Sequence, residues 1–247
     1  MRSEKFKFVA IVEARMTSSR LPGKMMMTIG GRPSLQILVE RLRQTPGLAE
    51  IVVATTHNPS DDSLAELCGQ LRVGCFRGSE EDVLGRVLGA ARFCGADVIV
   101  EITGDCTFID PILVQECVDA YMKSDADFVA NCVELPHYPP GMDARIFSTD
   151  ILAEVDSLTQ DPNDREHVSL YIWEHPELYR LLHLRPPQEL AWPDKFIALD
   201  TKEDLEMMRH IYDALAPKKF VFSAQDILAY LRAHTEISEL NNAARPS

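Results

Sequence analysis

The first hundred residues alternate between short apolar runs and amphipathic helical patterns, and this alternation most restricts the possible fold. The apolar runs cover residues 8–12, 51–54, 73–76 and 98–103. Between the first two, residues 34–43 repeat apolar side chains at the i, i+3, i+4, i+7 spacing of a helix that packs on a sheet. Parallel neighbouring strands need such long return connections. We therefore predict an α/β fold with a doubly wound, mostly parallel sheet and crossover helices on its faces.

The second half of the chain is less regular. We expect helices at residues 111–123, 148–157 and 201–214, one from Asp164 to Pro176, and strands at 127–133, 181–185 and 196–199. Thr201 with Asp204 approximates a capping box. Residues 134–145 hold three prolines and a glycine, which predicts an ordered excursion without regular structure. Since no repeat, low-complexity tract or linker is present, we predict one domain over residues 1–247.

The loop that follows the first apolar run has the composition of an anion-binding site. It carries Arg15, Arg20 and Lys24 among hydroxyl side chains, and Pro22 and Gly23 close it. Backbone amides of a tight loop and bidentate arginines suit the oxygens of a triphosphate. A solvated basic loop is the alternative interpretation of the same residues.

Two aspartates follow predicted strands and are candidates for a metal site. Ligands of parallel sheets bind beyond the carboxyl ends of the strands, so the loops that start at Glu13, Thr55, Arg77 and Gly104 should converge. Asp105 lies in the last of these loops, and Asp200 follows the strand predicted at 196–199. Carboxylate oxygens suit Mg²⁺, although Asp200 alone would fit a helix cap equally well.

Charge and composition limit the partners and the location. The net charge of −13 argues against nucleic acid as the main partner, and a local basic loop in an acidic chain favours a small anionic ligand. The six cysteines contain no C-x-x-C pair, which argues against a zinc knuckle or a disulfide framework. The start MRSEKFKF lacks the apolar region of a signal peptide, and no apolar run is long enough to span a membrane. We expect a cytoplasmic protein without a membrane partner.

Other catalytic motifs have little support in the sequence. The pair Asp125 and Asp127 forms a D-x-D, the metal motif of glycosyltransferases that use sugar nucleotides. It precedes a predicted strand, which places it at the wrong edge of a parallel sheet. The sequence contains no G-x-S-x-G, G-x-x-x-x-G-K-[ST] or G-x-G-x-x-G, which argues against serine hydrolases, P-loop NTPases and standard dinucleotide binding.

Several motifs together resemble the cytidylyltransferase superfamily, which includes CMP-sialic acid and CMP-Kdo synthetases. The strongest similarity is to its branch named for spore-coat polysaccharide biosynthesis protein F. The motifs are AR-M-TSS-RLPGK at 14–24, GGRP at 30–33, FRGSEEDVLGR at 76–86, ITGDCTFIDP at 102–111, DREHV at 164–168 and ALDTKEDLE at 198–206. The chain departs from the pattern at Glu13, where sialic-acid enzymes often have proline, at Thr107, where the family usually has proline, and at Ala144.

The resemblance implies a glycosyltransferase-A-like nucleotidyltransferase fold and a Mg²⁺-dependent transfer of CMP from CTP to an acidic sugar, with release of pyrophosphate, for a surface glycan. It also implies a role for each matching residue. Arg15, Lys24 and Asp105 would be catalytic, and Asp105 with Asp200 would bind Mg²⁺. The nucleotide would contact Ala14, Arg15, Arg20, Lys24, Gly78, Ser79, Arg86 and Asp105. The acceptor or a partner subunit would contact Gly141, Asp143, Arg165, Glu166 and His167.

Several alternatives stay open at this point. An acceptor that carries a phosphate or phosphonate is one alternative, and UTP in place of CTP is another. A glycosyltransferase that uses Asp125 and Asp127 and a non-catalytic nucleotide-binding homologue are the other hypotheses. Residues 134–165, rich in proline and apolar side chains, are expected to form the contact of a homodimer.

Overall fold

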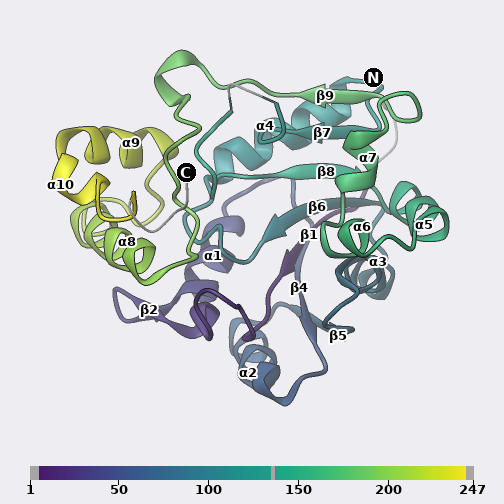
Figure 1. Ribbon diagram of the computed structural model, residues 1–247, viewed down its shortest axis with the longest axis horizontal. Helices are drawn as coiled ribbons and strands as arrows, with labels where there is room; N and C mark the ends of the chain where they lie inside the picture. The colour runs from purple at the N-terminus through teal and green to yellow at the C-terminus, as the bar shows by residue number, and fades with distance from the viewer. Residues whose placement is uncertain (1–5, 135–136, 243–247) are drawn as a thin grey trace.

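A seven-stranded sheet forms the centre of the computed structural model, which describes residues 6–134 and 137–242 (Figure 1). The strands, in spatial order, are β5 (Gly74–Gly78), β4 (Glu50–Thr56), β1 (Phe8–Glu13), β6 (Val98–Thr103), β8 (Arg145–Ser148), β7 (Phe128–Ala130) and β9 (Leu181–His183). Only β8 runs antiparallel to its neighbours, and the remaining pairs are parallel. The predicted α/β fold with a mostly parallel, doubly wound sheet is confirmed.

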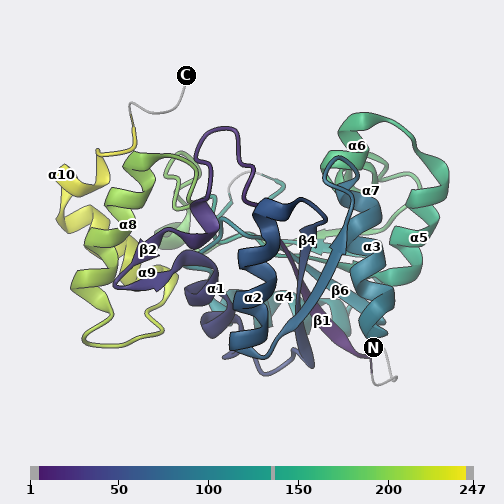
Figure 2. The same ribbon diagram turned by 90° about the horizontal axis from the view of Figure 1, so that it is seen from below.

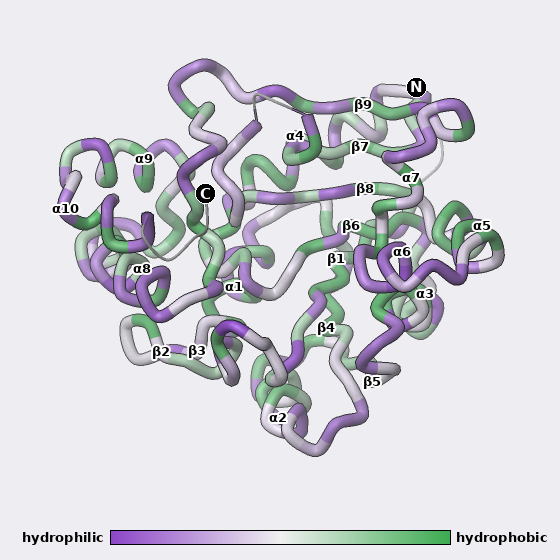
Figure 3. Tube along the Cα trace, in the orientation of Figure 1, coloured by the Kyte–Doolittle hydropathy of each residue, from purple (hydrophilic) through white to green (hydrophobic). Residues whose placement is uncertain are grey.

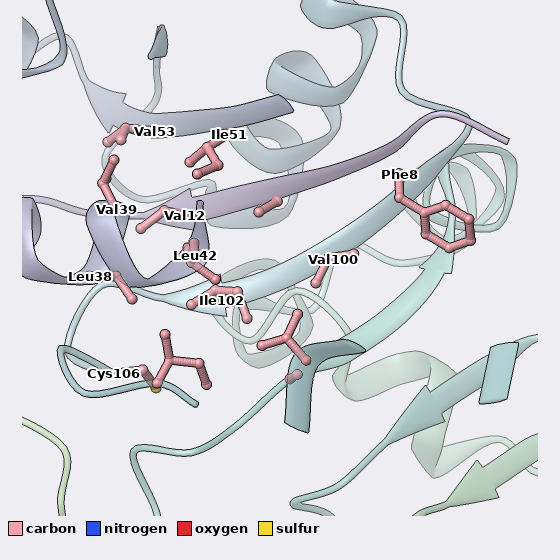
Figure 4. Close-up of a cluster of buried hydrophobic side chains, with 14 of the residues drawn as sticks. Phe8, Val12, Leu38, Val39, Leu42, Ile51, Val53, Val100, Ile102 and Cys106 are labelled. Atoms are coloured by element: carbon pink, nitrogen blue, oxygen red, sulfur yellow. The ribbon is translucent and has the colours of Figure 1, made fainter. Parts of the chain in front are cut away.

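Helices cover both faces of the sheet (Figures 1 and 2). One face packs against α1 (Ser34–Leu42), α2 (Asp62–Leu71) and α4 (Pro111–Lys123), and the other packs against α3 (Val83–Cys94) and α5 (Thr149–Leu158). Successive side chains of a strand point to opposite faces. In β1, Phe8 and Val12 therefore belong to the first core, drawn in Figure 4, while Val9 and Ile11 belong to the second. The residues of β1 are buried on both faces, which explains the unbroken apolar run.

A third core lies beside the sheet and is built largely from the C-terminal part of the chain. It contains α8 (Lys202–Leu215), α9 (Ala224–Ala233), α10 (Thr235–Ser238) and the hairpin of β2 (Thr28–Ile29) and β3 (Arg32–Pro33). In Figure 3, β1 and β4 run largely green, whereas α8 mixes green and purple residues as an amphipathic helix does. The predicted capping box of Thr201 and Asp204 begins α8.

Two buried cations connect this third core to its surroundings. The guanidinium of Arg41 donates to the carbonyls of Ile109 at 2.9 Å and Phe222 at 2.6 Å, and burial lowers the pKa of Arg41 to about 10. The ammonium of Lys195 donates to Oδ1 of Asn241 at 2.6 Å. The amide of Asn241 in turn donates to the carbonyl of Phe196 at 3.0 Å. The C-terminal residues thus hold the chain that precedes Asp200 and α8.

Three elements differ from the expectation. The strand β8 was not predicted, because Arg145 falls at the end of the expected excursion and Ser148 at the start of the expected helix. Residues 196–199 are not a strand. Their backbone amides donate instead to loops: those of Ile197 and Ala198 to the carbonyl of Pro140 at 2.7 and 3.0 Å, and that of Leu199 to the carbonyl of Asp105 at 3.0 Å.

The helix predicted from Asp164 to Pro176 is divided in two. The structure has α6 (Pro162–Glu166) and α7 (Leu170–Glu174), separated at His167, whose φ of −107° and ψ of 69° end the first helix. Three short 3₁₀ turns complete the described elements: η1 (Lys24–Met26), η2 (Pro59–Asp61) and η3 (Gln188–Leu190). Among the described helices, none combines the length and the apolar character required to cross a membrane.

Candidate active site

A pocket of about 260 Å³ lies at the carboxyl ends of β1 and β6. The loop after β1, the loop after β6, the start of α3, the end of α6 and the segment that precedes α8 all contribute to its wall. The lining residues are Glu13, Ala14, Arg15, Ser18, Ser19, Arg20, Lys24, Met25, Val83, Arg86, Thr103, Gly104, Asp105, Glu166, His167 and Asp200. Of the four loops predicted to converge, those that start at Glu13 and Gly104 line this pocket, whereas the loops that start at Thr55 and Arg77 do not.

The loop after β1 is held in a tight conformation by its own backbone and by the neighbouring loop. Gly23 has a φ of 77°, a left-handed conformation that favours glycine, and its amide donates to the carbonyl of Met16 at 2.8 Å. The amide of Met16 donates to Oδ1 of the buried Asp61 at 2.8 Å. Burial alone would raise the pKa of Asp61, but hydrogen bonds from Thr56, Met16 and Thr55 lower it. Asp61 thus stays ionised and fixes the loop.

Lys24 connects the two aspartates that the sequence singled out. Its Nζ lies 2.7 Å from Oδ1 of Asp200 and 3.2 Å from Oδ2 of Asp105, and the residue is 7% exposed. Burial opposes the charge of Lys24, but the two carboxylates raise its pKa above the ordinary value. On the solvent side, the guanidinium of Arg20 lies 2.8 Å from Oδ2 of Asp200. Two carboxylates and two cations thus meet at one wall of the pocket.

The two carboxylates fit a divalent cation that also binds substrate oxygens. Asp105 and Asp200 share one ammonium, so their oxygens face the same point. Within residues 6–134 and 137–242, no group of three or more His, Cys, Asp or Glu side chains is arranged to hold a metal ion. A cation here would have only two protein ligands, which leaves positions for water and phosphate as Mg²⁺ prefers.

The residues predicted to bind the nucleotide divide into two groups. Ala14, Arg15 and Arg86 line the pocket. Arg86 is 3% exposed, and one of its terminal nitrogens donates to the carbonyl of Ser79. Gly78 and Ser79 do not line the pocket but lie behind Arg86, where a Cβ on Gly78 would come within 3.0 Å of the Cγ of Arg86.

The residues predicted to bind the acceptor are also divided. Glu166 and His167 line the pocket. Arg165 points elsewhere: its guanidinium forms salt bridges with Asp82 at 2.6 Å and Asp156 at 2.8 Å, which join α6 to the start of α3 and to α5.

Gly141 and Asp143 lie in the excursion and line no pocket wall described here. Gly141 has a φ of 107°, and a Cβ there would lie 2.5 Å from the backbone nitrogen of Ala198. The absence of a side chain lets the excursion approach the segment that carries Asp200. The carboxylate of Asp143 lies 4.0 Å from Arg145, and burial raises its pKa.

A second pocket, of about 330 Å³, adjoins the first. Glu13, Thr103, Glu166 and His167 line both pockets. The other residues of the second pocket are Glu101, Arg145, Val168, Ser169, Leu170 and Trp173.

The sequence analysis did not assign a role to Glu101, Arg145 or Trp173. Glu101 is 4% exposed, and its Oε1 accepts a hydrogen bond of 3.4 Å from Arg145. Burial raises the pKa of Glu101, against the lowering effect of Arg145. A signal for this residue was present in the sequence, since Glu101 is the one charged residue in the apolar run at 98–103.

Glu13 lies at the boundary of the two pockets, and its pKa is strongly raised. Burial and the negative charge of Glu101 raise its pKa to about 8, while Arg145 and Arg86 act in the opposite direction. Its Oε1 is buried and has no hydrogen-bond partner within the described parts of the chain.

The alternative D-x-D motif lies away from this site. Asp127 directly precedes β7, and its Oδ2 and Oδ1 each accept a 2.8 Å hydrogen bond from the guanidinium of Arg180. Neither Asp125 nor Asp127 lines the two pockets. The pair therefore has a structural partner and no connection to the convergent loops.

Comparisons with known proteins find relatives that match most of this chain. The family model described as cytidylyltransferase matches residues 9–241. The chain is 32% identical to the spore coat polysaccharide biosynthesis protein SpsF of Bacillus subtilis, over 92% of this chain and 94% of that protein. It is 28% identical to a 3-deoxy-manno-octulosonate cytidylyltransferase of Geobacter metallireducens, over 75% and 82% of the two chains. The solved structure of a cytidylyltransferase from Leptospira borgpetersenii superposes with a TM-score of 0.88 at 31% identity, covering 94% of this chain and 97% of that one.

Proposed function

The chain belongs to the cytidylyltransferase family, and we propose on this basis that it transfers CMP from CTP to a sugar acid of the ulosonic type, with release of pyrophosphate, for a surface glycan. The acceptor class is suggested by the Geobacter metallireducens relative, which is named for an octulosonate. The observation that carries the proposal is the junction of Lys24 with Asp105 and Asp200 beside the arginine-rich loop.

In this proposal, the cations of the loop after β1 bind the triphosphate. Arg15, Arg20 and Lys24 line the pocket, and together they neutralise a triphosphate and orient its α-phosphorus. Transfer at phosphorus requires little covalent chemistry from protein side chains, so positioning and charge neutralisation account for most of the catalysis. Arg86 and Ala14 form the wall against which the nucleoside is held.

We assign the cofactor as Mg²⁺, held by Asp105 and Asp200. When bound, the ion supplies positive charge to the phosphate oxygens at the point where the two carboxylates converge. Lys24 then serves to keep both carboxylates in place. Glu166 and His167, which reach the pocket from the end of α6, are proposed to contact the acceptor.

Pyrophosphate release tests this function. The purified protein is incubated with CTP, MgCl₂ and a panel of ulosonic acids, and the expected result is release that depends on both CTP and acceptor. Asp105→Asn should abolish release, while Asp125→Asn, a matched change at the D-x-D, should preserve it. A glycosyltransferase would release no pyrophosphate from CTP, and its transfer of sugar from a sugar nucleotide would depend on Asp125 and survive Asp105→Asn.

Ligand binding separates the remaining alternatives. A thermal-shift screen of the four nucleoside triphosphates with Mg²⁺ should show stabilisation by CTP, since a ligand that binds only the folded state raises the melting temperature. Stabilisation by a purine triphosphate would contradict the proposal. CTP binding without turnover of any acceptor would favour a non-catalytic homologue.

The quaternary and cellular context completes the proposal. We propose a cytoplasmic protein of one domain that forms a homodimer through residues 134–165, as the resemblance implies. Light scattering of the purified protein would measure the mass, and a monomeric mass would contradict the dimer.

A further inference from the structure

We infer that the second pocket binds the reacting end of the acceptor and that Glu13 is the catalytic residue that takes the proton from an acceptor hydroxyl. The acceptor class is then a sugar that reacts through a hydroxyl group, and not one that reacts through a phosphate or phosphonate. This inference rests on the proposed cytidylyl transfer and adds the identity of the base.

The position of Glu13 is the first observation. Glu13 ends β1, directly before the loop of Arg15, and it lines both the first pocket and the second. An acceptor in the second pocket meets a nucleotide in the first at this residue. The Oε1 of Glu13 is buried and has no hydrogen-bond partner within the described residues, so its capacity to accept a hydrogen bond is unused.

A second unpartnered carboxylate oxygen belongs to the same pocket. Glu101 is 4% exposed, Arg145 and Ser169 hydrogen-bond its carboxylate, and its buried Oε2 has no further partner among the described residues. Buried polar atoms are rarely left unsatisfied, and two such oxygens in the lining of one pocket indicate a ligand that donates hydrogen bonds. A polyhydroxylated sugar supplies such donors.

The charges of the second pocket disfavour an anionic reacting group. Three carboxylates, those of Glu13, Glu101 and Glu166, line it together with Arg145 and His167. Arg145 is already engaged, at 3.4 Å from Glu101 and 4.0 Å from Asp143. A phosphate or phosphonate would place its negative charge on the reacting group itself, next to these carboxylates, which costs free energy. In an ulosonic acid the reacting hydroxyl is neutral, and the single carboxylate lies on the neighbouring carbon.

The protonation behaviour of Glu13 is consistent with a base. Several charged groups act on it from the neighbouring strands and loops. Burial, Glu101 and Asp105 raise its pKa, Arg145 and Arg86 lower it, and the result is about 8. Glu166 and His167 line the same two pockets. A general base is most effective when its pKa lies near the working pH.

The reaction balances without any further reactant. The acceptor oxygen forms a bond to the α-phosphorus of CTP, and the bond from that phosphorus to the bridging oxygen of the β-phosphate breaks. Pyrophosphate leaves with the electron pair of that bond. The acceptor proton passes to the carboxylate of Glu13 and from there to solvent, which restores the base.

Kinetics of Glu13→Gln test the assignment, with 3-deoxy-manno-octulosonate as the hydroxyl probe and 2-aminoethylphosphonate as the phosphonate probe. We expect kcat to fall about 10²- to 10⁴-fold with an unchanged KM for CTP, and the phosphonate to be inert. Glu177→Gln, at an exposed position outside both pockets, is the matched control and should retain full activity. An unchanged kcat in Glu13→Gln would overturn the inference, and so would turnover of the phosphonate that is faster than turnover of 3-deoxy-manno-octulosonate.

The pH dependence gives a readout that a purely structural role would not move. Because the base must be deprotonated, kcat should rise with pH through the pKa of Glu13. Glu101→Gln removes a negative charge that raises this pKa, so the rising limb should move to lower pH. The limb should be absent in Glu13→Gln. A limb that is unchanged in both variants would contradict the assignment.

A titration of the free protein separates this inference from the proposed function. Carbon-13 NMR of glutamate carboxyls, with Glu13→Gln for assignment, should show one group that titrates near pH 8. If CTP binds but Glu13 titrates below pH 5, the base assignment fails and the proposed function stands. If CTP does not bind, the proposed function fails, and with it the inference.

Discussion

Replacement of Lys24 by methionine would measure how far the site depends on one buried ammonium. Its Nζ lies 2.7 Å from Asp200 and 3.2 Å from Asp105. Loss of one partner of a buried ion pair costs about 3–5 kcal/mol, because the remaining charge is buried without compensation. Here the cost is smaller, since Arg20 still contacts Asp200 and the side chain of Asp105 is 23% exposed. We expect a loss of about 2 kcal/mol, or about 4–8 °C in melting temperature for a chain of this length.

Urea unfolding followed by the fluorescence of Trp173 and Trp192, in buffer with a chelator, measures this loss. Arg20→Met is the matched control, because it removes a cation from the same carboxylate of Asp200. The side chain of Arg20 is 66% exposed, so we expect its loss to lower the free energy of unfolding by less than about 1 kcal/mol. Equal losses in Lys24→Met and Arg20→Met would refute the argument from burial.

Two further measurements extend the test of Lys24. MgCl₂ should restore part of the stability of Lys24→Met, since a divalent cation can replace the missing charge between Asp105 and Asp200. The pKa of Lys24 is raised in the folded protein, so its contribution is complete below the ordinary value of 10.5 and is lost as the pH rises through the higher folded value. The difference between the variant and the parent should therefore be constant between about pH 6 and 9.

Two other substitutions have expected effects on stability, each checked by urea unfolding. Thr201→Ala removes the hydroxyl that caps α8 and should cost about 1 kcal/mol, and an unchanged midpoint would show that the capping box does not stabilise α8. Arg41→Met leaves the buried carbonyls of Ile109 and Phe222 without donors and should cost about 3 kcal/mol. The same change at the exposed Arg92 should cost less than about 0.5 kcal/mol, and equal costs at the two positions would contradict the role of Arg41.

The sequence predicts the parallel sheet and the site residues that follow β1 and β6 well, because these residues follow patterns of local periodicity. The buried run at 8–12 and the helical spacing at 34–43 depend on periodicity alone. Once the sheet is parallel, its topology brings the loops after β1 and β6 to one edge. Lys24 and Asp105 could therefore be placed together from the sequence.

Asp200 was placed correctly for a reason that the structure does not support. The apolar run at 196–199 satisfies the pattern of a strand, but its amides bond to the carbonyls of Pro140 and Asp105, which are distant in sequence. Local periodicity cannot distinguish these partners from those of a sheet. The same limit hid β8, where four residues pair between β6 and β7 only in the folded chain.

The second pocket was missed because its polar residues lie inside elements with apolar patterns. Glu101 belongs to β6 and Arg145 to β8, and each is explained only by the other. In the sequence, Glu13 appeared as one polar residue of a loop. Its raised pKa depends on Glu101, which lies on β6 two positions before Thr103, the register partner of Glu13. Cross-strand neighbours of this kind follow from register, which the sequence alone does not determine.

The attachment of Asp200 affects when the site forms during synthesis. Asp105 and Lys24 leave the ribosome early, with the strands that hold them, but the segment before Asp200 is also bound by Asn241, which is made 45 residues after Phe196. The bonds of residues 197–199 to Pro140 and Asp105 can form earlier, but the complete set that holds this segment can form only after Asn241 has been made. For the same reason, local opening of the last helices would loosen Asp200, and with it the proposed metal site, while β1, β4 and β6 stay paired. Catalytic competence should therefore disappear at lower denaturant concentrations than the sheet does.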